Sequence, residues 1–384
     1  CFLGVSCLGW SAASFCWFLL RLCAWVSVLP ISTKPSVIAA ITDFLVNLYC
    51  IYIYISQSLK KGETLQFKKC YSYSGLLIIL VVGSKLLFVE RYIEIIRNAY
   101  EGYANYLWQE ISFQYDYKPW WQNYFWALIL ISLLFLTWEW LRPWRKDQPK
   151  FRKDFWLDAF YMFFNFFLFS LILFNALSEV FVNAFNDFLG LFGLTNVVAL
   201  EIGSWSILLQ LFTLFIIRDF IQWWTHRLLH YSPRLWEYHK VHHSVEQMGF
   251  AAHLRYHWME TVVYRTIEYL PLAMIGFGID DFFFVHMFTL AIGHWNHANI
   301  KVRLGPLKYV LNNPNMHMWH HAHDLPEDRK YGVNFGLTLS IWDYLFGTAY
   351  IPYSGKSIKL GFPGVKKFPK TFWQQITHGF RKRY

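Results

Sequence analysis

Charged residues are scarce in this sequence. Asp, Glu, Lys and Arg make up 16% of the 384 residues, whereas hydrophobic residues make up 55%. An ordinary soluble chain carries roughly a quarter charged residues, so the hydrophobic excess here needs lipid to cover it. Apolar runs near the ~20 residues that cross a bilayer recur along the chain. The scarcity of charge therefore argues against a soluble protein and favours several transmembrane helices.

Cysteine is confined to one end of the chain. All six cysteines lie within the first 70 residues, mostly inside apolar segments, and none forms a CxxC pair. A disulfide framework is therefore not expected. Residues 1–20 also lack the basic segment that begins a secretory signal peptide, so a cleavable signal is not supported.

The net charge of +10 lacks any accompanying nucleic-acid recognition motif. The basic residues lie in segments that flank apolar runs. Residues 142–154 hold six Lys or Arg against two Asp, and the chain from residue 353 onward has eight Lys or Arg and no acid. This distribution predicts a positive cytoplasmic side and contact with anionic headgroups, and no nucleic acid as partner.

Hydrophobic periodicity predicts an all-α, polytopic membrane bundle with a histidine-rich helical cap on the cytoplasmic side. The expected spans are 2–20, 36–56, 75–89, 124–141, 156–182, 195–217, 262–278 and 281–298. If all of them cross, the basic segments and both histidine-rich segments share the cytoplasmic side. We expect a multi-pass integral membrane protein with an additional N-terminal membrane segment (1–115), a catalytic domain (116–352) and a basic cytoplasmic tail (353–384).

Fourteen of the fifteen histidines lie between His226 and His323, and three motifs hold eight of them. WWTHRLLH spaces two rings at i, i+4, about 40° apart around a helix. HKVHH and HMWHH each space three rings at i, i+3, i+4, within about 100°. Asn313 and Pro314 predict the start of a helix that carries the last motif. The eight motif histidines are His226, His230, His239, His242, His243, His317, His320 and His321.

Eight imidazoles are too many for one zinc ion, so two metals are the simplest interpretation. Imidazole suits iron, zinc, copper or nickel, and ligand chemistry alone does not choose among them. The sequence has no HExxH, no cysteine-based zinc set and no paired ExxH of carboxylate-rich di-iron bundles. Asp219 precedes His226 by seven residues, nearly in line on a helix, so it can accept a ligand N–H and fix its tautomer. Glu260 and Asp324 are further candidates for this role.

The segments DFIQWWTHRLLH, LWEYHKVHHS, NHAN, NPNMHMWHH and WDYLFGT, in this order, resemble the fatty acid hydroxylase and sterol desaturase superfamily. The resemblance implies a membrane enzyme with two non-haem iron ions, held by the eight motif histidines and by His297 of NHAN. It implies O2-dependent hydroxylation or desaturation of a lipid such as a sterol, fatty acyl chain, carotenoid or alkylglycerol. No fused haem or flavin segment is evident, so electrons would come from a separate electron-transfer protein or a pterin.

Other histidines are weaker candidates. His294 is about 60° from His297 on one helix and is a possible tenth ligand. His253 and His257 are expected near the ligands or the substrate path, and His286 in the hydrophobic core. His323 and His378 are left without a role. Two alternative functions use the same residues: a zinc-dependent membrane hydrolase, and a metal transporter or sensor.

Overall fold

The computed structural model describes residues 73–194, 202–275 and 279–380. The chain divides into two compact units, Cys1–Ile95 and Ile96–Tyr384. Of the first unit, the described part is the beginning of helix α3 (Tyr73–Ser112). The expected spans 2–20 and 36–56 lie outside the described residues. The functional division into 1–115, 116–352 and 353–384 stays a prediction.

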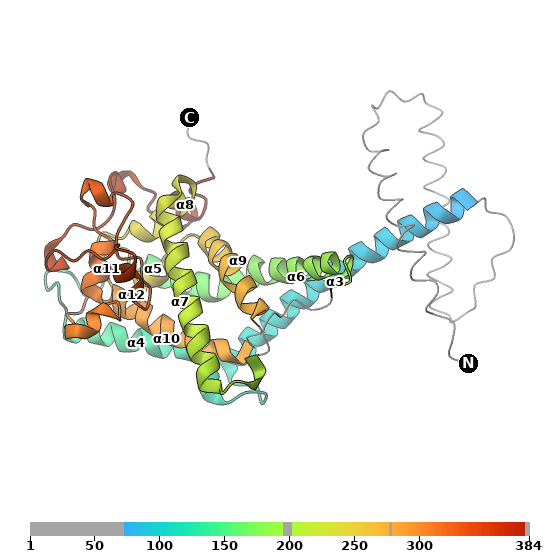
Figure 1. Ribbon diagram of the computed structural model, residues 1–384, viewed down its shortest axis with the longest axis horizontal. Coiled ribbons are helices and arrows are strands. Elements are labelled where there is room, and N and C mark those ends of the chain that lie inside the picture. The colour runs from blue at the N-terminus through green and yellow to red at the C-terminus, as the bar shows by residue number, and fades with distance from the viewer. Residues whose placement is uncertain (1–72, 195–201, 276–278, 381–384) are drawn as a thin grey trace, which may run out of the picture. The chain divides into compact units, whose positions relative to one another are not determined.

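The second unit is helical, and its described residues contain isolated β-bridges but no strand. This confirms the all-α fold class. After α3, the longer helices are α4 (Tyr124–Leu141), α5 (Phe155–Phe163), α6 (Asn175–Gly190), α7 (Ile207–Tyr231), α8 (Pro233–His243), α9 (Trp258–Met274) and α10 (Ile279–His297). Short helices α11 (Pro314–His320), α12 (Ile341–Leu345) and α13 (Phe372–Ile376) follow. Figure 1 shows α11 and α12 close together at one end of this unit.

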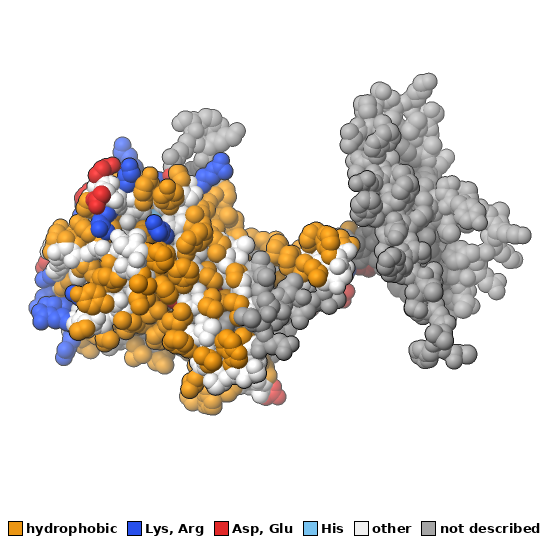
Figure 2. Space-filling model, viewed as in Figure 1, with side chains coloured by type: hydrophobic (Ala, Val, Ile, Leu, Met, Phe, Trp, Pro, Cys, Tyr) orange, Lys and Arg blue, Asp and Glu red, His pale blue; other side chains and the backbone are white. Residues whose placement is uncertain are grey.

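Three helical stretches among the described residues are long and apolar enough to cross a membrane: Tyr124–Leu141, Phe155–Gly190 and Ile207–Tyr231. The second joins α5 to α6 through two π-helical turns, Phe164–Leu168 and Ser170–Phe174. The first two correspond to the expected spans 124–141 and 156–182. Figure 2 shows hydrophobic side chains over most of the visible face of the described residues, as lipid contact requires.

Residues 195–201 of the expected span 195–217 lie outside the described residues, and the expected end at 217 was wrong. Helix α7 begins at Ile207 and continues to Tyr231, so His226 and His230 lie on a membrane-length helix and not in a polar segment after it. Arg218 and Asp219 lower the hydropathy without interrupting backbone hydrogen bonding, so the helix continues past them. The expected spans 75–89, 262–278 and 281–298 fall largely within α3, α9 and α10, which are not among the three candidate stretches.

Side-chain caps fix where the two short histidine helices begin. Ser232 accepts a hydrogen bond from the Leu235 N–H (3.5 Å) at the start of α8, and Pro233 takes the first helical position. Asn313 accepts from the Met316 N–H (3.1 Å) at the start of α11, again followed by proline. The predicted start of the last motif's helix is thus confirmed. Each cap satisfies a backbone donor that the first helical turn leaves unpaired.

The described residues after 352 pack against the helices. Val241 of α8 and Tyr161 of α5 share a buried cluster with Phe362, Val365 and Phe368. The Tyr161 hydroxyl also donates to the Gln375 side-chain oxygen at 3.1 Å. This part of the expected basic tail therefore belongs to the packed unit.

We predict that Asn313→Ala destabilises the protein by about 1 kcal/mol, because it removes the N-cap of α11. The midpoint of thermal unfolding of the purified protein measures this. Asn313→Ser keeps a capping oxygen and should stay near the unsubstituted protein. An equal loss in both variants would mean that the cap contributes nothing.

Candidate metal centre

The loop between α7 and α8 is short, so two histidine motifs lie side by side. His226 and His230 occupy adjacent turns of one face of α7. The chain then turns at Ser232, and α8 brings His239 back beside them, with its Nε2 3.1 Å from the His226 Nε2. The WWTHRLLH and HKVHH motifs therefore contribute to one site.

The nine predicted histidine ligands form two groups. In each group, one ligand atom per residue lies within 4.8 Å of all the others, as the sharing of one metal ion requires. The first group is His226, His230, His239, His243 and His320, and the second is His242, His297, His317 and His321. The structure thus brings together every residue of the predicted set, including His297. Their ligation of metal stays a prediction.

Each HxxHH motif contributes to both groups. In α8, the i and i+4 rings, His239 and His243, face the first group, whereas the i+3 ring, His242, faces the second. In the HMWHH motif the i and i+4 rings, His317 and His321, face the second group, and the i+3 ring, His320, faces the first. The two groups therefore adjoin, and the His243 and His321 ring centroids are 4.3 Å apart. A site with this arrangement can hold two metal ions close to each other.

Most rings are held through the nitrogen that faces away from the centre. His226 Nδ1 donates to the Phe335 carbonyl (2.8 Å) and His320 Nδ1 to the Val333 carbonyl (2.8 Å). His242 Nδ1 donates to the Arg255 carbonyl at 3.1 Å. A carbonyl only accepts, so these bonds fix the tautomer and leave Nε2 as a lone pair for a metal.

The pair His242 and His297 shows whether the site fits a bound cation. Both Nδ1 atoms donate to carbonyls, that of His297 to the Gly293 carbonyl at 2.8 Å, yet the two Nε2 atoms face each other at 3.2 Å. In neutral rings these are two lone pairs without a proton between them, which repel. Burial lowers the pKa of His242 to about 3, so protonation does not remove the conflict. A bound cation does remove it, and the donor set therefore fits a metal.

Other ring nitrogens in the centre have no hydrogen-bond partner among the described residues. His230, His243 and His320 each have a buried Nε2 without a hydrogen bond in the described structure. A buried polar atom without a partner costs free energy, so such atoms mark a missing ligand. Burial and neighbouring histidines hold the pKa of His243 and His320 well below the ordinary value, so both are neutral and able to ligate.

Glu260 is the carboxylate that meets a ligand ring. Its Oε2 lies 2.7 Å from His239 Nδ1, and the residue is 3% exposed. Burial raises the pKa of Glu260 to about 8. A cation on His239 favours the ionised carboxylate, which in turn makes the ring a stronger ligand. Sequence reasoning had named Glu260 as one candidate for this role.

Asp219 does not make the expected bond to a histidine. It accepts from the Thr338 and Leu339 N–H groups (both 3.2 Å) and from Trp342 Nε1 (2.8 Å). Seven residues place it almost in line with His226 but about 10 Å away along the helix axis, beyond reach of that ring. Its role in the described structure is to hold the chain that follows α11 against α7.

Asp343 was missed by sequence reasoning, although it lies in the quoted WDYLFGT segment. It accepts from the Phe335 and Gly336 N–H groups (both 2.8 Å) and from Trp223 Nε1 (3.0 Å). Phe335 is the residue whose carbonyl orients His226. Asp343 therefore positions a ligand ring through the backbone. Its spacing from the histidines gives no sign of this, because the backbone that it holds meets a ring 109 residues away in the sequence.

The remaining histidines lie outside both groups. His294 is buried, with its ring nitrogens 3.1 Å from Ser132 Oγ and 2.9 Å from His253 Nδ1. It is therefore engaged elsewhere and is not placed as a tenth ligand. Aromatic rings surround His257 and His286, and carboxylates adjoin His323 and His378.

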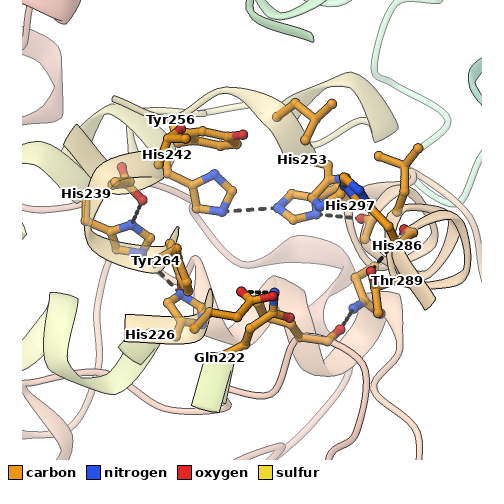
Figure 3. A pocket seen from close by; sticks show the side chains of 18 of the residues that line it. Gln222, His226, His239, His242, His253, Tyr256, Tyr264, His286, Thr289 and His297 are labelled. Carbon is orange, nitrogen blue, oxygen red and sulfur yellow. Dashed lines mark hydrogen bonds and ion pairs between the residues drawn. The ribbon is translucent and has the colours of Figure 1, made fainter. Parts of the chain in front are cut away.

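A cavity of about 190 Å³ adjoins the centre. Five of the nine histidines line it, and they come from both groups: His226, His239, His242, His297 and His317. Figure 3 shows His226, His239 and His242 around its open middle. Leu254, Leu290 and Leu337 contribute apolar wall, and several buried polar residues complete the lining. The cavity can hold part of an apolar molecule beside the ligand atoms.

Comparison with known proteins identifies this region. Residues 211–348 match the family model "Fatty acid hydroxylase". The ornithine lipid hydroxylase of Rhizobium tropici is 31% identical over 180 residues, 47% of this chain and 53% of the relative. Human alkylglycerol monooxygenase is 33% identical over 141 residues, 36% and 30% of the two chains. A very-long-chain aldehyde decarbonylase of Oryza sativa is 26% identical over 141 residues, 34% and 21% of the two chains.

The match of residues 211–348 and the similarity to these relatives support the resemblance to the fatty acid hydroxylase and sterol desaturase superfamily. The chain spans about half the length of the first of these relatives and less of the others. No solved structure matches it. The matched residues contain all nine histidines of the two groups. They also contain Asp219 and Asp343, the two carboxylates that hold the surrounding chain.

We predict that His320→Ala lowers the metal content of the purified protein, because it removes a ligand from the first group. Elemental analysis per chain measures this. His378→Ala is the control, since His378 lies against Glu237 and away from both groups. An equal loss of metal in the two variants would argue against the ligand set.

We also predict that Glu260→Gln weakens metal retention by about 10- to 100-fold, because the amide supports His239 less well than a carboxylate. Competition with a chelator measures it. Glu237→Gln is the matched control, as Glu237 pairs with Lys240 on the outer side of α8. If both variants retain metal equally, Glu260 does not tune the centre.

Proposed function

We propose that this protein is a membrane-bound di-iron oxidoreductase that uses O2 to hydroxylate a C–H bond of a lipid, or to desaturate it. The observation that carries the proposal is the facing Nε2 pair of His242 and His297, which a metal resolves. The relatives support the reaction class, since two of them are named as a lipid hydroxylase and a monooxygenase.

The choice of iron rests on chemistry and on the family. Imidazole suits iron, zinc, copper and nickel, but zinc has no redox chemistry. Oxidation of a C–H bond by O2 needs a redox-active metal, and iron is the one that the family resemblance implies. When bound, two iron ions would supply the activation of O2. Two groups of five and four histidines support two ions.

The residues of the chain position the reactants and exclude water. The carbonyls of Phe335, Val333 and Arg255 hold the ligand rings in place. The leucines of the cavity hold an acyl or alkyl segment against the centre. Hydroxylation balances as one O2, two electrons and two protons per C–H bond, which gives an alcohol and water. The electrons come from an external donor, either an electron-transfer protein or a pterin.

We place the protein in a membrane that it crosses several times, with the centre on the cytoplasmic side. The three membrane-length helices support the membrane setting. The basic residues of 142–154 and of the chain from 353 onward support a cytoplasmic side near the histidine motifs.

We predict that cells expressing the intact protein contain a lipid that differs by one oxygen, or by two hydrogens, from its precursor. Cells expressing His242→Ala should lack it, because that variant loses a ligand of the second group. Mass spectrometry of lipid extracts measures this, with His378→Ala as the active control.

The same comparison without O2 separates the alternatives. The di-iron oxidase requires that the product disappear under anaerobic growth. A zinc-dependent hydrolase would release its product without O2 or reductant. A metal transporter or sensor would change metal uptake and leave the lipid extracts identical, and either result would overturn the proposal.

A further inference from the structure

One face of α7 carries polar residues far into a membrane-length helix. Arg218, Gln222, His226 and His230 recur at intervals of four, so they form a single stripe. The last two belong to the metal centre, and the first two line the same cavity. An ionisable residue inside a membrane span is costly and marks a functional site when it faces a cavity.

Arg218 is neutralised within the protein. Its Nε donates to Glu268 of α9, and its Nη1 donates to the Thr289 hydroxyl of α10 at 2.9 Å. Gln222 donates to the second Glu268 oxygen at 3.0 Å. Arg218, Gln222 and Glu268 are at most 9% exposed. Because Glu268 already balances the charge of the guanidinium, the pair does not need an anionic ligand.

The network still offers both a donor and an acceptor to the cavity. Among the described residues, no hydrogen bond involves Arg218 Nη2 or the Gln222 carbonyl oxygen. Neither atom is among the fully buried polar atoms that lack a partner. A group that both accepts and donates completes this pair. A hydroxyl or an amide does so, whereas a carboxylate or phosphate only accepts and a hydrocarbon does neither.

We infer that Arg218 and Gln222 form a subsite for a neutral hydroxyl or amide group of the lipid, which rests on the function proposed above. Gln222 lies one helical turn, about 6 Å along the axis, from His226. The reacting carbon is therefore a few bonds from that polar group, and the apolar remainder of the lipid lies against the leucine wall. Figure 3 shows Gln222 beside His226, with Thr289 at the far end of the cavity.

A binding experiment tests the subsite without O2 or reductant. The full chain, with its metal, is placed in phosphatidylcholine nanodiscs, and displaceable binding of tritiated hexadecanamide is measured. Hexadecane and hexadecanoate compete as probes with the same chain length. Hexadecanamide should bind more tightly than either. Gln222→Met keeps the side-chain length but lacks the carbonyl, so it should weaken amide binding about fivefold, as loss of one hydrogen bond implies.

Gln210→Met is the matched control, because Gln210 lies on the same helix but bonds to the Trp205 carbonyl and does not line the cavity. It should bind hexadecanamide like the unsubstituted protein. Thr289→Val covers the case in which Gln222→Met fails to fold, since it frees the guanidinium from one of its anchors; it should show the same selective loss. Metal content is measured in every variant and should not change.

The subsite is overturned if hexadecane or hexadecanoate binds as tightly as the amide, or if Gln222→Met matches Gln210→Met. Loss of metal in Gln222→Met together with unchanged selectivity in Thr289→Val would also overturn it. Selective amide binding without any oxygen-dependent lipid product would contradict the proposed function and leave the subsite supported. A lipid product whose yield is unchanged in Gln222→Met would overturn the subsite and leave the proposed function standing.

Discussion

The arrangement of this protein depends on imidazole rings whose outward-facing nitrogens already donate hydrogen bonds. Once Nδ1 of His242 and of His297 donates to a backbone carbonyl, the inward Nε2 atoms carry lone pairs, and at 3.2 Å these repel. A cation that binds both nitrogens relieves that repulsion. Because the backbone carbonyls fix the tautomers, the site fits a metal before any metal enters. The helices serve to hold those carbonyls in place.

Two buried carboxylates do much of that work at a distance from the rings. Asp343 holds the backbone around Phe335, and Asp219 holds residues 338–342 against α7. Both act on the chain after α11, which supplies the carbonyls behind His226 and His320. The irregular chain between 321 and 348 therefore belongs to the centre as much as the histidine helices do. A metal site that relied on short loops alone would lack this support.

Helix α7 is long and apolar enough to cross a membrane and also carries two of the predicted metal ligands. One stripe of the helix presents, in order, an arginine paired with Glu268, an amide and two imidazoles. In the function proposed above, a lipid that enters beside this stripe would meet its polar residues and then the predicted metal ligands. Under that proposal, the rise of the helix would set the distance between a polar group of the lipid and the oxidised carbon.

The sequence by itself predicted the set of candidate ligands. The spacings i, i+3 and i+4 place rings on one helical face whatever the fold, so the eight motif histidines and the caps of α11 were predictable, and the family resemblance added His297. Tertiary structure decided how the rings divide, with each HxxHH motif split between two groups, because that depends on how α8 and α11 face each other. It also decided that Asp219 meets Leu339 and that Asp343 meets Trp223, because the residues of each pair lie 120 positions apart and leave no local pattern.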